Sequence, residues 1–173
     1  METLAQPLAH LHHLILTVET DRPAGFFDIT DRVTRLVAEA GFRSGIVNVQ
    51  TRHTTTGVIV NEHEPLLLAD FDDFLERLAP ARLEYRHDDE SRRTVNHVPG
   101  ERPNGHAHCR ALLLPSSACL NVVDARLQLG RWQRLFLVEL DGPRSRELSV
   151  MLLGAQNPSG QTTAVRRMAM VSR

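Results

Sequence analysis

The sequence contains no lysine, so all 20 of its basic residues are arginines. Chemistry that needs a lysine amine is therefore excluded, both a Schiff base with a carbonyl substrate and the phosphate-binding lysine of a P-loop. The arginines are balanced by 21 acidic residues, which gives a formal net charge of −1. This balance argues against a nucleic-acid partner held by bulk phosphate neutralisation and against a polybasic membrane anchor.

Cysteine is also scarce, with only Cys109 and Cys119 present. They form neither a CxxC motif nor a disulfide framework, so we expect reduced thiols. A helix start could activate Cys109 as a nucleophile, but a small packed thiol is the favoured interpretation. No apolar run approaches the roughly 20 residues of a membrane helix, and the first residues do not resemble a signal peptide. We therefore expect a cytoplasmic protein without a membrane partner.

The 173 residues and their 42% hydrophobic content suit one domain with a sizeable core. Six segments show the short apolar or alternating pattern of strands, namely residues 10–18, 45–50, 56–60, 119–123, 134–140 and 147–153. Three segments have helical spacing, bounded by Thr30 and Gly41, by Pro65 and Pro80, and by Asn104 and Pro115. This order predicts an α+β fold with antiparallel β-sheets and about three helices in a single domain. We expect the domain over residues 1–155 and a mobile tail over residues 156–173.

A long polar segment, Arg82–Gly105, interrupts this pattern. A loop of that length inside a compact domain is usually functional or disordered. Arg86, His87, Asp88 and Asp89 lie within it and favour a functional role.

Histidine is abundant, with nine copies, and its side chain suits metal binding and proton transfer near neutral pH. His53, His87 and His108 are far apart in sequence, so only the fold can bring them together. Three histidines with one open position would suit Zn²⁺. The short HExxH pattern is missing, so spacing alone supports this weakly. His10 and His12 alternate along a strand and could form half of a metal site, whereas His63 and His97 are interpreted as surface or loop residues.

The HxH pair His106 and His108 lies at a predicted helix start, where the two side chains would be about 200° apart and only one could point inward. Free N–H groups at that start can bind an anion. Asn104 as N-cap, and Arg110 one turn beyond His106, could therefore hold a substrate phosphate. The alternative is an ordinary cap followed by a surface arginine.

Five blocks of the sequence are QTRHTTTGVIVNEHEP, LxxLAP, YRHDD, PNGHAHCRALLLPSS and RLQLGRWQRLFLVELDGPRSREL. In this order they resemble the YjbQ family, known as secondary thiamine-phosphate synthases. The resemblance implies a small α+β domain with antiparallel sheets, a homotrimer, and a metal-containing pocket near the subunit boundary. It also implies a weak transferase activity that joins a pyrimidine diphosphate to a thiazole phosphate and releases pyrophosphate.

By position, the resemblance assigns the metal-binding histidines to His53, His87 and His108, and the acid of the NE pair to Glu62. The expected cofactor is a divalent metal, zinc first and magnesium or manganese as alternatives. Three departures are visible, one of which is Arg131 after Gly130, where a small residue is frequent. The lysine that is common after the AH pair is Arg110 here, which changes the geometry of the charge. The usual GRL reads Ala125-Arg126-Leu127, which puts a tight turn with positive φ in doubt.

These residues suggest one mechanism, in which the metal and the helix start neutralise a diphosphate leaving group. Glu62 and His108 are the catalytic candidates, with Glu62 as general base or as the holder of a metal-bound water. Asn104, Arg110 and Arg131 are candidates for binding a small phosphorylated ligand. Trp132 would pack against a heteroaromatic ring or serve as a core or interface anchor. The competing functions are a non-catalytic trimer that binds metal or small phosphates, and a metal-dependent hydrolase.

Overall fold

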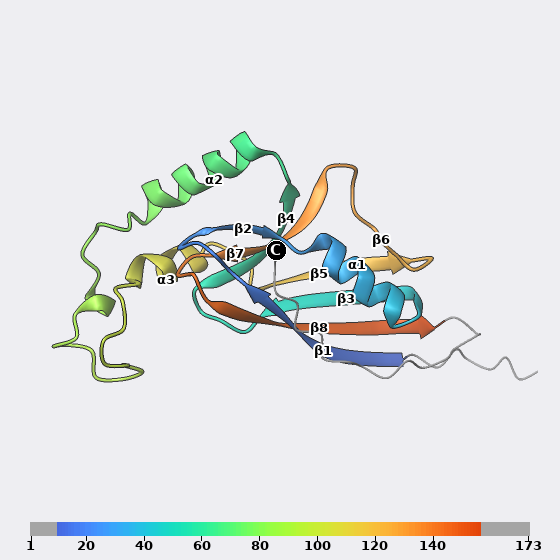
Figure 1. Cartoon of the computed structure of the whole chain (residues 1–173), viewed down its shortest axis with the longest axis horizontal. Coiled ribbons are helices and arrows are strands. Elements are labelled where there is room, and N and C mark those ends of the chain that lie inside the picture. Colours follow the sequence, from blue (N-terminus) through green and yellow to red (C-terminus); the bar gives the residue numbers. More distant parts are fainter. Residues whose placement is uncertain (1–9, 157–173) are drawn as a thin grey trace, which may run out of the picture.

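A computed structural model describes residues 10–156 of the chain. Its elements in chain order are β1 (His10–Glu19), β2 (Gly25–Asp28), α1 (Thr30–Glu39), β3 (Phe42–Thr51), β4 (Thr56–Glu62), α2 (Pro65–Leu78), the 3-10 turn η1 (Arg86–Asp88), α3 (Gly105–Ala111), β5 (Ser117–Val123), β6 (Arg126–Leu127), β7 (Gln133–Glu139) and β8 (Ser145–Gln156). The predicted α+β class with three α-helices is confirmed (Figure 1).

The strands form two sheets, a five-stranded sheet in the order β1-β8-β3-β5-β6 and a three-stranded sheet in the order β2-β7-β4. Every pairing between the described strands is antiparallel, as predicted. The main core lies between the two sheets, because alternate residues of each strand point inward. Leu135 and Leu137 of β7 meet Val47, Val150 and Leu152 of the larger sheet there, all fully buried.

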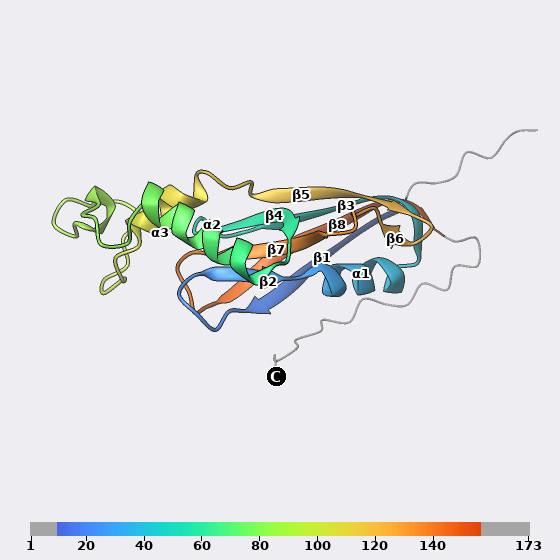
Figure 2. The ribbon, with the colours of Figure 1, turned by 90° about the horizontal axis from the view of Figure 1, so that it is seen from above.

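The opposite face of the three-stranded sheet is covered by helices. Phe136 and Val138 of β7 point away from the main core, and Val138 packs with Leu75 of α2 and Ala107 of α3. Figures 1 and 2 show α2 running along this side of the molecule. The apolar stripe of α2 is therefore used within the chain.

Local sequence signals explain the helix ends. The side chain of Glu64 accepts hydrogen bonds from the N–H groups of Leu66 and Leu67, and Pro65 occupies the first turn of α2, where no N–H is needed. Gly41 follows α1 with a φ of +69°, which is the left-handed stop we predicted. The predicted cap of α1 is wrong by one position, because Ile29 is the N-cap and Thr30 donates its N–H to Asp28.

The sequence pattern missed β2 and β6, and β8 continues to Gln156, where we had expected the tail to begin. Residues 157–173 lie outside the described part. The tight turn between β5 and β6 does form, with Asp124 and Ala125 both at positive φ. Two such residues make the hairpin geometry that usually contains glycine, so Ala125 adopts it at a cost of about 1–2 kcal/mol.

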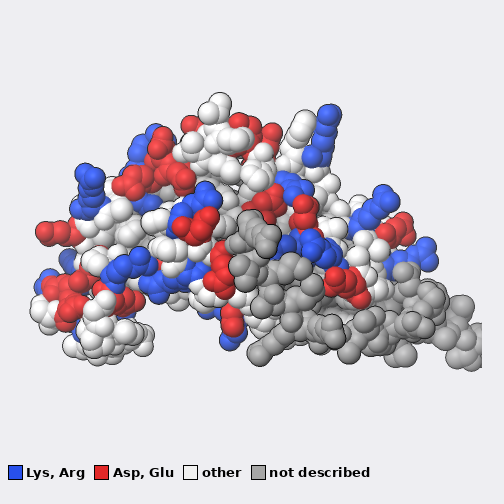
Figure 3. All heavy atoms as spheres, viewed as in Figure 1, with Lys and Arg blue, Asp and Glu red and all other residues white. Residues whose placement is uncertain are grey.

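Within residues 10–156, no helix combines the length and the apolar character that crossing a membrane would require. On the face shown in Figure 3, arginine and acidic side chains are interspersed over the described surface rather than separated by sign. This distribution matches the near-neutral net charge of the sequence.

Candidate functional site

The centre of the candidate site is a turn held against the start of a helix. Asp88 of η1 accepts hydrogen bonds from the N–H groups of Asn104 and Gly105, at 2.9 and 2.8 Å from its Oδ1. These N–H groups have no partner within the helix, so the carboxylate caps α3 from 16 residues upstream in the chain. Gly105 is needed here, since a Cβ would clash with Cβ of Tyr85. The turn and the helix therefore form one unit.

The contact between Asp88 of η1 and the start of α3, which we call the clasp, brings two of the predicted metal ligands together. The rings of His87 and His108 meet edge to face, with centroids 4.5 Å apart. Nε2 of His87 is buried and has no hydrogen-bond partner among residues 10–156. Burial lowers the pKa of His108, and the neighbouring His87 lowers it further. His106 lies against Tyr85 instead, with ring centroids 6.4 Å apart, as expected if only one member of the HxH pair faces the site.

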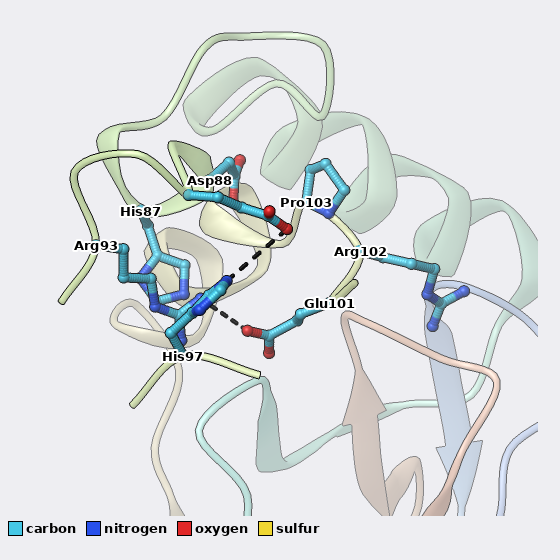
Figure 4. Close-up of a pocket in the computed structure, with 8 residues that line it drawn as sticks. His87, Asp88, Arg93, His97, Glu101, Arg102 and Pro103 are labelled. Carbon is cyan, nitrogen blue, oxygen red and sulfur yellow. Dashed lines mark hydrogen bonds and ion pairs between the residues drawn. The ribbon is translucent and has the colours of Figure 1, made fainter. Parts of the chain in front are cut away.

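Beside His87 the loop forms a small pocket (Figure 4), lined by His87, Asp88, Glu90, Arg93, His97, Glu101, Arg102 and Pro103. Arg93 and Glu101 form an ion pair of 2.7 Å across it. Nε2 of His97 is also buried without a hydrogen-bond partner, and its nearest carboxylate oxygen, on Glu90, is 3.8 Å away. We had interpreted His97 as a surface or loop residue, whereas its ring borders the pocket.

Two residues predicted to hold a phosphate are engaged in structural contacts. Arg110 is buried and donates to the carbonyl of Ala79, 2.9 Å away, and to the carboxylate of Glu76. It therefore completes the C-terminal end of α2. The side chain of Asn104 makes no capping bond and donates to Asp141 at 3.1 Å. The helix start is thus already occupied by a carboxylate, and the expectation of an open anion site there is corrected.

His53 lies apart from the pair, in the connection between β3 and β4. Its Nε2 accepts a hydrogen bond of 2.8 Å from the N–H of Glu147, so the ring takes the place of a backbone carbonyl beside β8. Burial lowers the pKa of His53, and Arg146 acts in the same direction. Among residues 10–156 there is no group of three possible ligands around one point. Within the described part of a single chain, His53 therefore does not join His87 and His108 in one group, and the three-histidine metal site near the subunit boundary stays a prediction.

Glu62, Arg131 and Trp132 lie in a third region of the fold, separate from the His87–His108 pair and from His53. Glu62 is paired with Gln133, the residue after Trp132, at the end of the three-stranded sheet where α2 begins. The 14 residues of α2 span about 21 Å, and its far end contacts Arg110. Within one chain, Glu62 is therefore too remote to act as a base at His87 and His108. The Arg131 guanidinium lies 4.5 Å from the Trp132 ring, whose side chain is exposed.

The comparisons with known proteins agree with this fold and these motifs. A family model described as UPF0047 protein YjbQ-like matches residues 15–155. The chain belongs to the YjbQ-like UPF0047 family. It is 39% identical over 138 residues to a UPF0047 protein of Archaeoglobus fulgidus, covering 80% of this chain and 98% of that protein. It is 36% identical over 139 residues to a UPF0047 protein of Methanothermobacter thermautotrophicus, covering 80% and 90%.

Solved structures place this YjbQ-like chain in the same family. One is described as a YbjQ-like protein of unknown function from Sulfolobus solfataricus, with a TM-score of 0.74, 30% identity, and coverage of 85% of this chain and 99% of that one. Another, from Clostridium acetobutylicum and described as uncharacterized, has a TM-score of 0.69 and 32% identity, with coverage of 80% and 98%. The family and fold predictions are confirmed, while these relatives are described without an activity.

Glu90, Arg93 and Glu101 contribute to the site but were not named by the sequence analysis, which named Asp88 only as one of four polar residues of the loop. The only sequence signal was the concentration of charged and imidazole side chains in a loop without apolar periodicity. That signal indicated where a site would lie. Which carboxylate caps α3, and which imidazole lines the pocket, depends on how the loop folds back.

Proposed function

We propose that this protein is a metal-dependent member of the YjbQ-like family that binds a small phosphorylated ligand and acts as a weak thiamine-phosphate synthase. The single observation that carries the proposal is the contact of His87 with His108 beside a pocket, with a buried ring nitrogen that has no partner. Burying a polar atom without a hydrogen bond costs free energy, so such an atom points to a ligand.

His87 and His108 are chemically suited to serve as two of the ligands of a divalent metal. Neutral imidazole is the form that binds a metal, and the lowered pKa of His108 keeps its ring neutral at pH 7. Residues 10–156 of one chain do not supply a third ligand to the pair. We therefore include the homotrimer in the proposal, with His53 of a second copy completing the set. A bound zinc ion would polarise a phosphate oxygen and neutralise charge on a diphosphate leaving group.

The chain's own residues would position the substrates. In the proposed reaction, the carbon–oxygen bond to the diphosphate breaks, a carbon–nitrogen bond to the thiazole nitrogen forms, and pyrophosphate leaves. Asp88 holds His87 in place through its cap on α3. Arg102, at the pocket edge, pairs with Asp141 at 3.8 Å and donates to the carbonyl of Gly142 at 3.2 Å, and we propose its remaining N–H groups as donors to a phosphate group. Arg131 and Trp132 are proposed for the ring and phosphate of the second substrate across a subunit boundary.

One observation favours a non-catalytic alternative, a trimer that binds metal and small phosphates without turnover. Glu62, the predicted general base, is separated from the histidine pair by the length of α2. Unless a second copy supplies it, the pair has metal ligands but no such base. A metal-dependent hydrolase would need the same base and is therefore favoured less by this geometry.

Metal analysis tests the proposal directly. The purified wild type, His87→Ala, His108→Ala and His53→Ala are compared by inductively coupled plasma mass spectrometry, with His10→Ala as the matched control. We expect bound metal in the wild type and control, and a loss of more than tenfold in the three site variants. A metal-free wild type after incubation with zinc would overturn the metal site. Bound metal without thiamine-phosphate formation from the two substrates would favour the binding alternative.

A further inference from the structure

Three buried side-chain atoms within residues 10–156 have no hydrogen-bond partner, and all three belong to one short stretch of the chain. They are Nε2 of His87, Nε2 of His97 and Oδ1 of Asn104. Proteins pair nearly all of their buried polar atoms, because an unpaired one costs free energy. A concentration of such atoms in one loop therefore marks a place where a ligand supplies the partners. The proposed function uses only the first of the three.

Asn104 is the most deeply buried of these residues, with 3% of its surface exposed. Its Nδ2 donates to Oδ2 of Asp141 at 3.1 Å and to Oε1 of Glu101 at 3.4 Å. The opposite orientation of the amide would turn its oxygen toward two carboxylates, so these contacts fix which atom is left over. That atom is an oxygen, which accepts hydrogen bonds and cannot donate them.

The backbone of Asn104 is fully used within the described part of the chain. Its N–H and that of Gly105 donate to Asp88, and its carbonyl accepts from the N–H groups of Ala107 and His108. The side-chain oxygen is therefore what this residue offers to a ligand. It has the polarity opposite to the phosphate site that we expected at the helix start, because a phosphate group also presents acceptors.

Asn104 lies directly behind the wall of the loop pocket, since Glu101, its hydrogen-bond partner, lines that pocket. In Figure 4 the rings of His87 and His97 and the carboxylate of Glu101 turn toward the same space. Burial lowers the pKa of His108, and the charges of Asp141 and Glu101 oppose that shift. The acceptors around Asn104 are thus close to the histidine pair of the proposed function.

The charges around this oxygen are already compensated within the chain. Glu101 is paired with Arg93 at 2.7 Å, and Asp141 is paired with Arg144 at 2.8 Å. The site therefore offers acceptors without an excess of negative charge. This combination fits a neutral amino group better than an ammonium ion, which would need a carboxylate of its own. An amino group on an aromatic ring is neutral at pH 7 and presents two N–H donors.

We infer that the loop pocket binds an aromatic amine, whose N–H groups donate to Oδ1 of Asn104 and to Nε2 of His97. The inference rests on the proposed function in that it names a group of the same small ligand, at the end that carries no phosphate. It requires neither the metal nor the transfer reaction. Arg102 at the pocket edge remains the proposed phosphate contact.

Calorimetric titration of the metal-free wild type with two probes of the same shape tests the inference. The probes are 4-aminopyrimidine and 4-methylpyrimidine, under conditions in which both are neutral. The methyl group is close in size to the amino group and has no N–H to donate. We expect the amine to bind at least about tenfold more tightly, because the methyl probe leaves both acceptors unpaired. Equal dissociation constants, or no binding of the amine, would overturn the inference.

Variants then assign the preference to its residues. Asn104→Leu keeps the side-chain size and removes the oxygen, and Asn121→Leu is the matched control at an exposed asparagine of β5. We expect the two probes to bind Asn104→Leu equally and the control to keep the wild-type preference. His97→Phe keeps a ring, loses Nε2 and covers the case in which Asn104→Leu does not fold, and we expect at least about a threefold loss of preference. The full wild-type preference in either folded variant would overturn the inference.

The metal measurements separate this inference from the proposed function. A protein that takes up no zinc but prefers the amine would keep the amine site and remove the metal site. A protein that binds zinc through His87 and His108 and does not distinguish the two probes would do the reverse.

Discussion

Two polar clusters of this molecule, a buried one around Glu139 and Arg146 and a half-exposed one in the loop around His87 and His97, resemble each other in composition and differ in how their atoms are satisfied. In the core cluster, Glu139 accepts two hydrogen bonds from Arg146, at 2.6 and 2.5 Å, and further bonds from Thr20 and from two backbone N–H groups. In the loop cluster, Nε2 of both His87 and His97 is buried without a hydrogen-bond partner in the described part of the chain, and the nearest carboxylate oxygen to His97, on Glu90, is 3.8 Å away. The first cluster is closed on itself, whereas the second has unused ligand atoms.

The difference separates a structural role from a binding role more sharply than residue type does. Both clusters combine basic and acidic side chains, and both lie where the chain turns. A closed network needs nothing from outside, because each charge is compensated within the protein. Unsatisfied imidazole nitrogens are unfavourable in the free protein and gain when a ligand binds. The comparison therefore predicts large stability losses from changes in the core cluster and small ones from changes in the loop cluster.

The largest expected effect follows from breaking the core pair. The side chains of Arg146 and Glu139 are 4% and 0% exposed, so Arg146→Met leaves a carboxylate buried without its partner. We expect the free energy of unfolding to fall by about 3–5 kcal/mol, measured by urea denaturation. The double variant Arg146→Met with Glu139→Leu removes both charges and should regain most of that loss. If Arg146→Met is as stable as the wild type, the buried charge of Glu139 does not depend on Arg146 for compensation.

Acid should weaken the same cluster to a smaller extent. Burial raises the pKa of Glu139, but the bonds from Arg146 and from the N–H of Asp141 outweigh it, so the pKa lies below the ordinary value of 4.5. The unfolded chain then takes up a proton at a higher pH than the folded chain. Stability from this group is complete above pH 4.5 and is lost as the pH falls through the folded pKa. Denaturation at stepped pH should show this loss in the wild type and a flatter profile in the double variant.

A smaller effect is expected at the clasp that carries the loop cluster. Asp88→Ala removes the acceptor for the N–H groups of Asn104 and Gly105 and should cost about 1 kcal/mol. Asp88→Asn keeps an oxygen acceptor and should cost less. Both are measured by thermal unfolding of the metal-free protein. If Asp88→Ala matches the wild type, another group caps α3.

Helix α2 and strand β2 show which parts of the fold the sequence could and could not predict. The ends of α2 were readable because Pro65 and Pro80 mark them locally, and the helix runs from Pro65 to Leu78. Strand β2 was missed because it has four residues and its partner is more than a hundred positions away, with Gly25 opposite Glu139. Local periodicity carries no information about such a pairing.

In the candidate site, too, long-range contacts decided what the sequence could not predict. The resemblance selected His87 and His108, and the fold brings them together. His53 came from the same resemblance, but the connection between β3 and β4 holds it against Glu147. Arg110 was interpreted as a phosphate partner from its spacing at a helix start, and its side chain instead ends α2. Tertiary contacts at a distance decide each of these outcomes.

The smallest stability effect, and the sharpest test of the comparison, is expected for His87→Phe. Phenylalanine keeps the ring contact with His108 and removes the buried nitrogen that lacks a partner. In metal-free protein we expect a free energy of unfolding within about 1 kcal/mol of the wild type, because no hydrogen bond is lost. Added zinc should raise the melting temperature of the wild type and leave that of the variant unchanged. A loss above about 2 kcal/mol without metal would mean that His87 is structural, and the two clusters would then differ only in size.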